Sequence, residues 1–285
     1  MDQKRVLAIH DISCIGRCSL TVALPIISAA GVECAVMPTA ILSTHTGGFK
    51  GYTYRDLEED LIPIAEHWAS LGLRFDAVYT GFLGSQDQVN VILKTIDMLT
   101  DDDTMVVVDP VMGDDGRMYP VFPKTFPREM RRLCNIADVI IPNVTEAMLL
   151  LGKEAKPTLD DSIEDTLMSL GAICKGNVVL TGASDEGERT GVATYSKADG
   201  GIYKYPQSKI PGTYHGTGDV FGSILVSALM RGWTLNESSR LAANLTKRSI
   251  ERAYSMDADT RYGVQFEKEI PTLIEMLDKG MLECL

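Results

Sequence analysis

The sequence predicts an α/β fold, a three-layer αβα sandwich in which helices cover both faces of a central, mostly parallel sheet. Three observations support this prediction. Short apolar segments rich in β-branched residues alternate with segments of helical periodicity. The strand-like segments are apolar throughout, as are strands that are buried on both faces. No linker, repeat or low-complexity tract divides the 285 residues, so we expect one domain over residues 1–285.

The predicted strands are short apolar runs that end at polar or glycine-containing loops. In chain order they cover residues 6–9, 34–37 (with 40–42 extending or following it), 77–80, 105–108, 139–141 and 178–181. Residues 190–195 and 201–205 predict a hairpin. Residues 10–18 and 43–51 are expected to be loops, and the length of the second favours a functional role.

The predicted helices are amphipathic segments between these strands. In chain order they cover residues 20–30, 56–71, 87–99, 147–151, 159–175, 220–229, 236–254 and 267–279. Ser19 is expected to cap the first helix, and Pro25 to kink it or shift its start. Because ligands gather beyond the carboxyl ends of parallel strands, the polar residues that follow the strands are the candidates for a site.

The charge balance excludes several classes of partner. Lys and Arg number 27 against 39 Asp and Glu, a formal charge of −12. No basic block appears, which argues against binding to nucleic acid or to anionic membranes.

No apolar run approaches a bilayer span, and residues 1–5 do not resemble a signal peptide. With six scattered cysteines, we expect reduced thiols and a cytoplasmic location.

A glycine-rich element opens directly into the predicted helix at 220–229. Gly216 and Gly218 allow backbone N–H groups to approach an anion, and the helix start adds the positive end of its dipole. Asp219 follows them, and its carboxylate would serve as a base toward a substrate hydroxyl. These residues alone also allow a plain helix cap, in which the glycines form an ordinary turn.

Acidic residues at neighbouring strand ends predict a metal–phosphate site. Asp109, Asp114 and Glu146 supply the hard oxygen ligands that suit Mg²⁺, with water molecules completing the shell. Asp109 alone is better explained as the cap of a turn made by Pro110, whereas three acidic residues at neighbouring strand ends favour the metal–phosphate role. Other sites are disfavoured, because the chain lacks a Walker motif, a dinucleotide fingerprint and a hydrolase elbow. A zinc cluster of Cys14, Cys18, His10 and His45 has loose spacing and no second cysteine pair.

Three segments resemble the ribokinase-like superfamily in order and spacing: Asp-Pro-Val-Met-Gly at 109–113, Pro-Asn-Val-Thr-Glu at 142–146 and Gly-Thr-Gly-Asp at 216–219. Within it, the chain is most similar to the vitamin B6 (pyridoxal/pyridoxamine) kinases, and the match runs nearly end to end. Ser-Thr-His-Thr-Gly at 43–47 is the most discriminating segment. Residues 9–16 and 79–85 are similar to further substrate-side motifs of that family.

The resemblance implies ATP-dependent phosphorylation of the 5′-hydroxymethyl group of a B6 vitamer, with Mg²⁺ as cofactor. It implies that Asp219 is the catalytic base, beside an anion hole formed by Gly216, Thr217 and Gly218. The implied ATP-binding residues are Asp109, Asn143, Glu146 and Thr181, and the implied Mg²⁺ residues, acting directly or through water, are Asp109, Asp114 and Glu146. The implied substrate-binding residues are Asp11, Thr46, Phe82 and Tyr119.

Two positions depart from the family pattern. Asp11 stands where better-known members have Ser, and Phe82 where they have Tyr. We hypothesise that Asp11 accepts a hydrogen bond from the pyridine nitrogen or the ring hydroxyl and favours an aminomethyl ring over the aldehyde.

Other functions stay open. Hydroxymethylpyrimidine kinases share the 109–113 element, and a vitamer-binding protein without chemistry would keep the same pocket. A sugar or nucleoside kinase is disfavoured, because no β-rich lid insertion is visible early in the chain. Family resemblance suggests a homodimer whose partners are the vitamer and ATP, and it leaves a requirement for K⁺ open.

Overall fold

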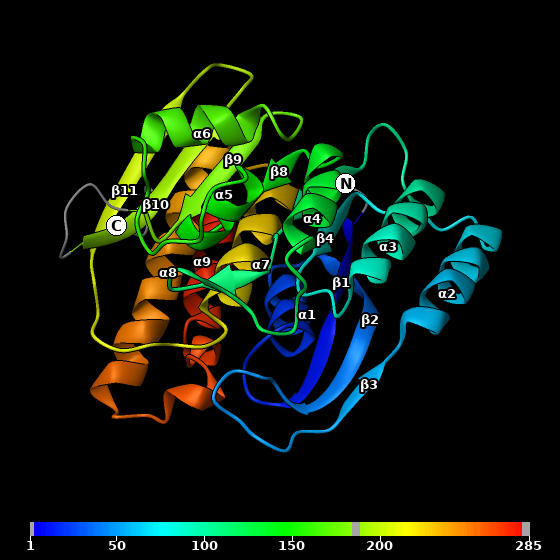
Figure 1. Cartoon of the computed structure of the whole chain (residues 1–285), viewed down its shortest axis with the longest axis horizontal. Coiled ribbons are helices and arrows are strands. Elements are labelled where there is room, and N and C mark those ends of the chain that lie inside the picture. The colour runs from blue at the N-terminus through cyan, green and yellow to red at the C-terminus, as the bar shows by residue number, and fades with distance from the viewer. Residues whose placement is uncertain (1–2, 184–188, 281–285) are drawn as a thin grey trace. The chain divides into compact units, whose positions relative to one another are not determined.

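The computed structural model describes residues 3–183 and 189–280, which form two compact units. Unit 1 is drawn from Met1–Leu57 and Ile210–Leu285, and unit 2 is Glu58–Lys209. In Figure 1 the blue N-terminal elements of unit 1 lie beside its yellow-to-red C-terminal helices. Unit 1 is thus built from the two ends of the chain. The single domain expected over residues 1–285 stays a prediction.

The strands of unit 1 are longer than expected. β1 (Arg5–Ile15) pairs in parallel with β2 (Glu33–Thr44), and β2 pairs antiparallel with β3 (Tyr54–Asp56). The loop predicted from residue 10 is wrong as far as residue 15, because β2 continues to offer backbone partners there. A register shift between His10 and Ile12 accommodates the polar residues. β3 was not predicted.

The helices of unit 1 pack against one another through α7 (Thr217–Met230), which contacts both α1 (Leu20–Ala29) and α8 (Leu235–Ser255). α7 is buried along most of its length, because nearly all its residues from Val220 to Ala228 are small or apolar. α9 (Ile270–Lys279) completes the unit, after two short 3₁₀ turns at Thr260–Tyr262 and Phe266–Lys268. The predicted positions of these helices are confirmed to within a few residues.

A buried carboxylate joins α8 to the start of α9. Glu269 is 3% exposed and pairs with Arg248 and Arg252 of α8, each at an N–O distance of 2.8 Å. The two arginine side chains are 46% and 38% exposed, so water still solvates them. The desolvation free energy of this ion-pair cluster therefore comes mainly from the Glu269 carboxylate.

The strand order of unit 2 is β11-β10-β9-β8-β5-β4. β4 (Ala77–Thr80), β5 (Met105–Val108), β8 (Val139–Ile140) and β9 (Asn177–Thr181) are parallel, and β10 (Arg189–Ser196) and β11 (Ile202–Ser208) form the predicted antiparallel hairpin beside β9. The helices are α2 (Glu58–Ser70), α3 (Gln86–Leu99), α4 (Phe126–Asn135), α5 (Val144–Leu150) and α6 (Ile163–Gly171). The α/β class and its mostly parallel strands are confirmed.

Three features of unit 2 differ from the sequence predictions. α4 and a small hairpin of β6 (Gly113–Asp114) and β7 (Arg117–Met118) were missed. α6 begins at residue 163, not 159, because Ser162 caps it by accepting the backbone N–H of Asp165 at 3.0 Å.

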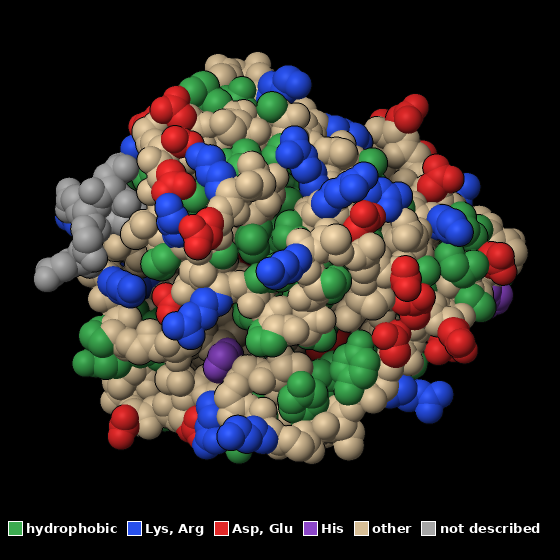
Figure 2. Space-filling view, in the orientation of Figure 1, with side chains coloured by type: hydrophobic (Ala, Val, Ile, Leu, Met, Phe, Trp, Pro, Cys, Tyr) green, Lys and Arg blue, Asp and Glu red, His purple; other side chains and the backbone are tan. Residues whose placement is uncertain are grey.

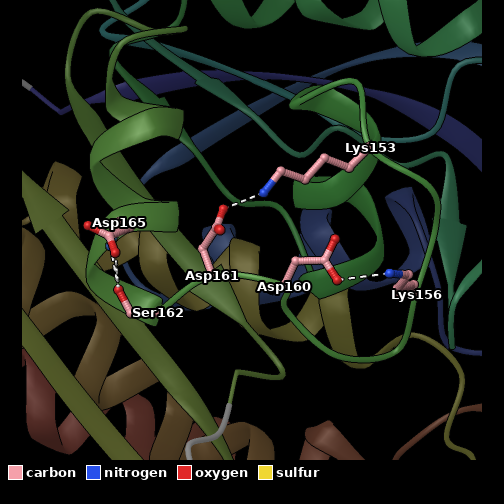
Figure 3. A network of polar contacts seen from close by, with 6 residues as sticks. All are labelled: Lys153, Lys156, Asp160, Asp161, Ser162 and Asp165. Atoms are coloured by element: carbon pink, nitrogen blue, oxygen red, sulfur yellow. Dashed lines mark hydrogen bonds and ion pairs between the residues drawn. The ribbon is translucent and has the colours of Figure 1, made fainter.

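Two ion pairs lie in the loop that precedes α6. Figure 3 shows Lys153 bonded to Asp161 and Lys156 bonded to Asp160, the second at 2.9 Å. Both aspartates belong to the segment that was expected to be helical. The helix begins only after them, where Ser162 caps α6.

The surface agrees with the charge balance of the sequence. On the face shown in Figure 2, Lys and Arg side chains are interspersed with Asp and Glu. Within residues 3–183 and 189–280, no helix combines the length and apolar character needed to cross a bilayer.

We predict an asymmetric loss of stability at the α8–α9 junction. Replacing both arginines (Arg248→Ala with Arg252→Ala) leaves the Glu269 carboxylate buried and unpaired, and should lower the free energy of unfolding by about 3–5 kcal/mol. Glu269→Gln leaves only partly exposed arginines and should cost clearly less. Urea unfolding of both variants measures this, and equal losses would contradict the account.

Candidate active site

The first turn of α7 is fixed by one glycine. Gly216 precedes the helix with φ 72°, in the left-handed region that favours glycine. A Cβ at this position would lie 1.8 Å from the carbonyl oxygen of Arg17. Only glycine therefore allows this close approach. The following residues, Thr217 and Gly218, carry N–H groups of the first turn, which have no acceptor within a helix and attract anions.

Asp219 is the third residue of α7 and is largely buried, with a side-chain exposure of 17%. Burial raises its pKa to about 7, a backbone hydrogen bond from Ser19 acts in the opposite direction, and the nearby charge of Asp11 adds to the rise. His10 Nδ1 lies 3.9 Å from Asp219 Oδ1. A carboxylate that titrates near neutral pH is suited to accept and return a proton.

Asp11 shares this buried polar cluster. It is 4% exposed and accepts hydrogen bonds from the hydroxyls of Ser19 at 2.5 Å and Ser13 at 3.1 Å. Burial raises its pKa, and the two hydroxyls oppose that rise. The pKa of the neighbouring Cys18 thiol is also raised, by burial and then by the charge of Asp219. Cys18 therefore stays a neutral thiol.

Ser19 occupies the N-cap position of α1, as predicted, but its side chain does not make a capping bond. Its backbone has φ 55°. Its hydroxyl donates to Asp11 instead. No local sequence pattern predicts this bond, because its acceptor lies on β1. His10, next to Asp219, was likewise considered only as a metal ligand.

The predicted substrate loop after β2 is held by His45. Its Nδ1 accepts the backbone N–H of Gly47 at 3.1 Å, and its Nε2 lies 2.5 Å from the carbonyl oxygen of Arg261. This pair of contacts fixes the tautomer with the proton on Nε2. Phe49 packs edge-on against His45, and the Arg261 guanidinium lies 5.5 Å from the Phe49 ring centre. Thr46 is exposed within this ordered turn.

The predicted ATP-side residues of unit 2 meet at a capping box. Asn143 Oδ1 accepts the backbone N–H of Glu146 at 2.9 Å, and Glu146 Oε2 accepts that of Asn143 at 2.9 Å. Glu146 Oε1 also accepts the N–H of Met112 at 3.1 Å, and Asn143 Nδ2 donates to the Gly113 carbonyl at 2.8 Å. Glu146 is 3% exposed, and burial raises its pKa to about 8.

Two further predicted residues lie at the same strand ends. Asp109 follows β5 and is 7% exposed. Thr181 ends β9, forms a parallel bridge with Asn143 and donates its N–H to the Pro142 carbonyl at 2.9 Å. The structure thus brings the polar residues after β5, β8 and β9 together, as the strand-end argument predicts.

The three residues predicted to hold Mg²⁺ do not form a set of direct metal ligands. Asp114 is exposed, and both oxygens of Glu146 are occupied by backbone N–H groups. Across the described parts of the chain, no three acidic, histidine or cysteine side chains gather closely enough to hold a metal ion directly. The Mg²⁺ role of Asp109, Asp114 and Glu146 stays a prediction, in the form in which water molecules mediate the contact.

The last two predicted substrate residues belong to unit 2. Phe82 follows β4, and its ring centre lies 5.6 Å from that of Phe122, which stacks on Phe126 at 3.8 Å. Tyr119 follows β7, is 37% exposed and donates its N–H to the Met112 carbonyl at 2.9 Å. Phe82 thus rests on an aromatic stack, and the Tyr119 side chain is partly exposed.

We predict that Gly216→Ala lowers the free energy of unfolding by roughly 3 kcal/mol or more, because the added methyl meets the Arg17 carbonyl in addition to the strain of positive φ. Gly232→Ala is the matched control. Gly232 follows the other end of α7 with φ 84° and would meet no atom within 4 Å. It should cost only about 1 kcal/mol. Urea unfolding compares the two, and equal costs would rule out the close approach.

Comparisons with known proteins agree with this arrangement. The phosphomethylpyrimidine kinase family model matches residues 23–263. A pyridoxal kinase of Vibrio vulnificus is 31% identical over 216 residues, which cover 72% of each chain. The crystal structure of pyridoxal kinase from Lactobacillus plantarum is 30% identical, with a TM-score of 0.89 over 97% of this chain and 99% of that chain.

A Bacteroides thetaiotaomicron protein, described as a phosphomethylpyrimidine kinase and crystallised in a form with pyridoxal, is 35% identical. Its TM-score is 0.90, over 95% of this chain and 96% of that chain. These likenesses confirm the predicted ribokinase-like fold and the resemblance to the pyridoxal kinases. The chain belongs to the phosphomethylpyrimidine kinase family.

Proposed function

We propose that this protein transfers the terminal phosphoryl group of ATP to the 5′-hydroxymethyl group of a vitamin B6 vitamer, giving the 5′-phosphate and ADP. The observation that supports it most is a buried carboxylate, Asp219, whose pKa is about 7 in the first turn of a helix. The pyridoxal kinases among the relatives, and the Bacteroides protein crystallised with pyridoxal, support a B6 vitamer as the substrate.

The roles follow from the chemistry of each group. Asp219 accepts the proton of the substrate hydroxyl as its oxygen attacks the phosphoryl group. The N–H groups of Gly216, Thr217 and Gly218, together with the helix dipole, stabilise the charge that develops on the transferred group. Such transfers need little covalent chemistry from the protein, so positioning and charge neutralisation supply most of the rate.

ATP and its metal are assigned to the strand-end residues of unit 2. Asp109 and Glu146, assisted by Asp114 and Asn143, would hold Mg²⁺ through water, and Thr181 would contact the phosphates. These oxygen-rich groups fit a hard cation that arrives with the nucleotide and neutralises its phosphate charge. Whether K⁺ is also needed is tested by exchanging it for Na⁺ in the assay.

Two further proposals concern the state of the protein. The family resemblance supports a homodimer, which light scattering after size-exclusion chromatography would reveal. The free thiols of Cys14, Cys18, Cys34, Cys134 and Cys174 support a reducing compartment such as the cytoplasm.

Phosphorylation of hydroxymethylpyrimidine is the second candidate, because the matching family model is described by that ring. A coupled assay of ADP formation with pyridoxal, pyridoxamine, pyridoxine and hydroxymethylpyrimidine distinguishes the candidates. We expect a B6 vitamer to give the highest kcat/KM, as the named relatives suggest. Preference for the pyrimidine would overturn the substrate assignment, and ADP formation with none of the four would leave a binding protein.

We predict opposite effects of pH on activity and stability at Asp219. Activity needs the ionised carboxylate, so kcat/KM should rise as pH increases through about 7. The folded pKa lies above the usual 3.8, so the stability that this group contributes is complete below pH 3.8 and is lost as pH rises through about 7.

Asp219→Asn should therefore reduce turnover by roughly 10²–10⁴-fold. The same variant should raise the free energy of unfolding at pH 8 by about 1–3 kcal/mol, since the amide stays neutral. Steady-state kinetics and urea unfolding at pH 6 and pH 8 measure both effects. An active variant, or one with no gain in stability at pH 8, is inconsistent with a buried base.

A further inference from the structure

We propose that His215 is a positioning residue for the vitamer: its imidazole ring holds the substrate loop after β2 (residues 45–51) against the turn that leads into the anion-binding glycines. This inference rests on the proposed function, because it assigns the residue that fixes Thr46, a predicted vitamer-binding residue. His215 does not touch the reacting atoms in this account.

Thr46 depends on its neighbours for its position. It is exposed, whereas His45 and Gly47 on either side of it are half-buried. His45 is anchored through Nε2 at the carbonyl oxygen of Arg261, and its Nδ1 accepts the N–H of Gly47 at 3.1 Å. Whatever packs against these two neighbours therefore determines where the Thr46 hydroxyl lies.

The His215 ring packs against both neighbours. Its centre lies 4.9 Å from that of the His45 ring, with the two planes tilted by 46°. A Cβ on Gly47 would lie 2.5 Å from Cε1 and 2.8 Å from Nδ1 of His215, so the ring occupies the space that a side chain would need. Gly47 is not among the glycines with positive φ. The ring, and not the backbone conformation, therefore requires glycine at this position.

His215 is also joined directly to the anion-binding turn. It precedes Gly216, whose backbone is fixed by its close approach to the carbonyl oxygen of Arg17. One ring thus sets the spacing between Thr46 and the N–H groups in the first turn of α7, and all of these residues belong to unit 1. A vitamer bound at Thr46 has to present its hydroxyl group at those N–H groups, so this spacing governs productive binding.

Removing the ring should loosen the substrate loop and leave the anion-binding turn in place. We expect His215→Ala to raise the KM for the preferred vitamer roughly tenfold, because the loop then adopts the binding conformation only part of the time. The KM for ATP and kcat should stay within about twofold of the wild type, since Gly216 keeps its own contact. His67→Ala, on the exposed face of α2, is the matched control and should leave all three constants unchanged.

Gly47→Ala tests the same contact from the loop. Its methyl group meets the His215 ring, so this variant should also raise the vitamer KM roughly tenfold. If both residues act through one contact, the double variant Gly47→Ala with His215→Ala should be no worse than either single variant. Independent effects would multiply to about a hundredfold and would overturn the inference.

Two further results would overturn it. An unchanged vitamer KM in His215→Ala would show that the bonds of His45 hold the loop without the second ring. A lower kcat with an unchanged vitamer KM would show that His215 acts on the anion-binding turn alone. If His215→Ala does not fold, Gly47→Ala still decides, because an unchanged vitamer KM in that variant contradicts the account.

The contact can also be tested without turnover. Hydrogen exchange of residues 45–51 in the free protein, followed by mass spectrometry, should be faster in His215→Ala than in the wild type and unchanged in His67→Ala. Equal exchange in the wild type and His215→Ala would contradict the inference even in an inactive protein. A wild-type protein that phosphorylates no vitamer would instead refute the proposed function, which keeps the two failures distinct.

Discussion

The carboxylate of Asp219 is held largely out of water at the positive end of α7, and the rest of unit 1 is arranged to permit this. The helix can begin there only because Gly216 lets its backbone reach the carbonyl of Arg17. Burial alone would keep the acid protonated at neutral pH. A backbone N–H from Ser19 partly restores the charged form, and the result is a pKa of about 7. Burying this carboxylate lowers the stability of the folded protein, and it produces a group that can exchange a proton near neutral pH.

Glu146 is also a buried carboxylate, but its hydrogen bonds give it a different role from Asp219. Its two oxygens accept backbone N–H groups from Asn143 and Met112, so it ties the start of α5 to the segment after β5. Its pKa is raised to about 8 by burial, close to that of Asp219, yet its oxygens are already occupied. Asp219 receives one backbone N–H and stands in the first turn of its helix, at the positive end of the helix dipole. The number of donors around each carboxylate, more than its burial, separates Asp219, proposed to accept a proton, from Glu146, which orders the backbone and is proposed to reach Mg²⁺ only through water.

Much of this could be predicted from the sequence, because local physics decides it. The short strands of unit 2 were placed closely because they are buried on both faces. Gly216 and Gly218 ahead of an apolar helix predict an anion site, which stays a prediction. The missed features depend on distant partners. β1 continues to Ile15 because β2 lies beside it. The hydroxyl of Ser19, which precedes α1, donates to Asp11 of β1, and no composition or spacing predicts that bond or the positive φ of Ser19.

The ionisation of Asp219 can be observed without any assay of turnover. A carbon-13 NMR titration of the carboxyl groups in the free protein, with the signal assigned by its absence in Asp219→Asn, reports the pKa of this side chain directly. We predict a midpoint near pH 7, well above the usual 3.8. A midpoint near pH 4 would show a solvated carboxylate and would contradict the central claim, that a buried base is prepared at the start of α7.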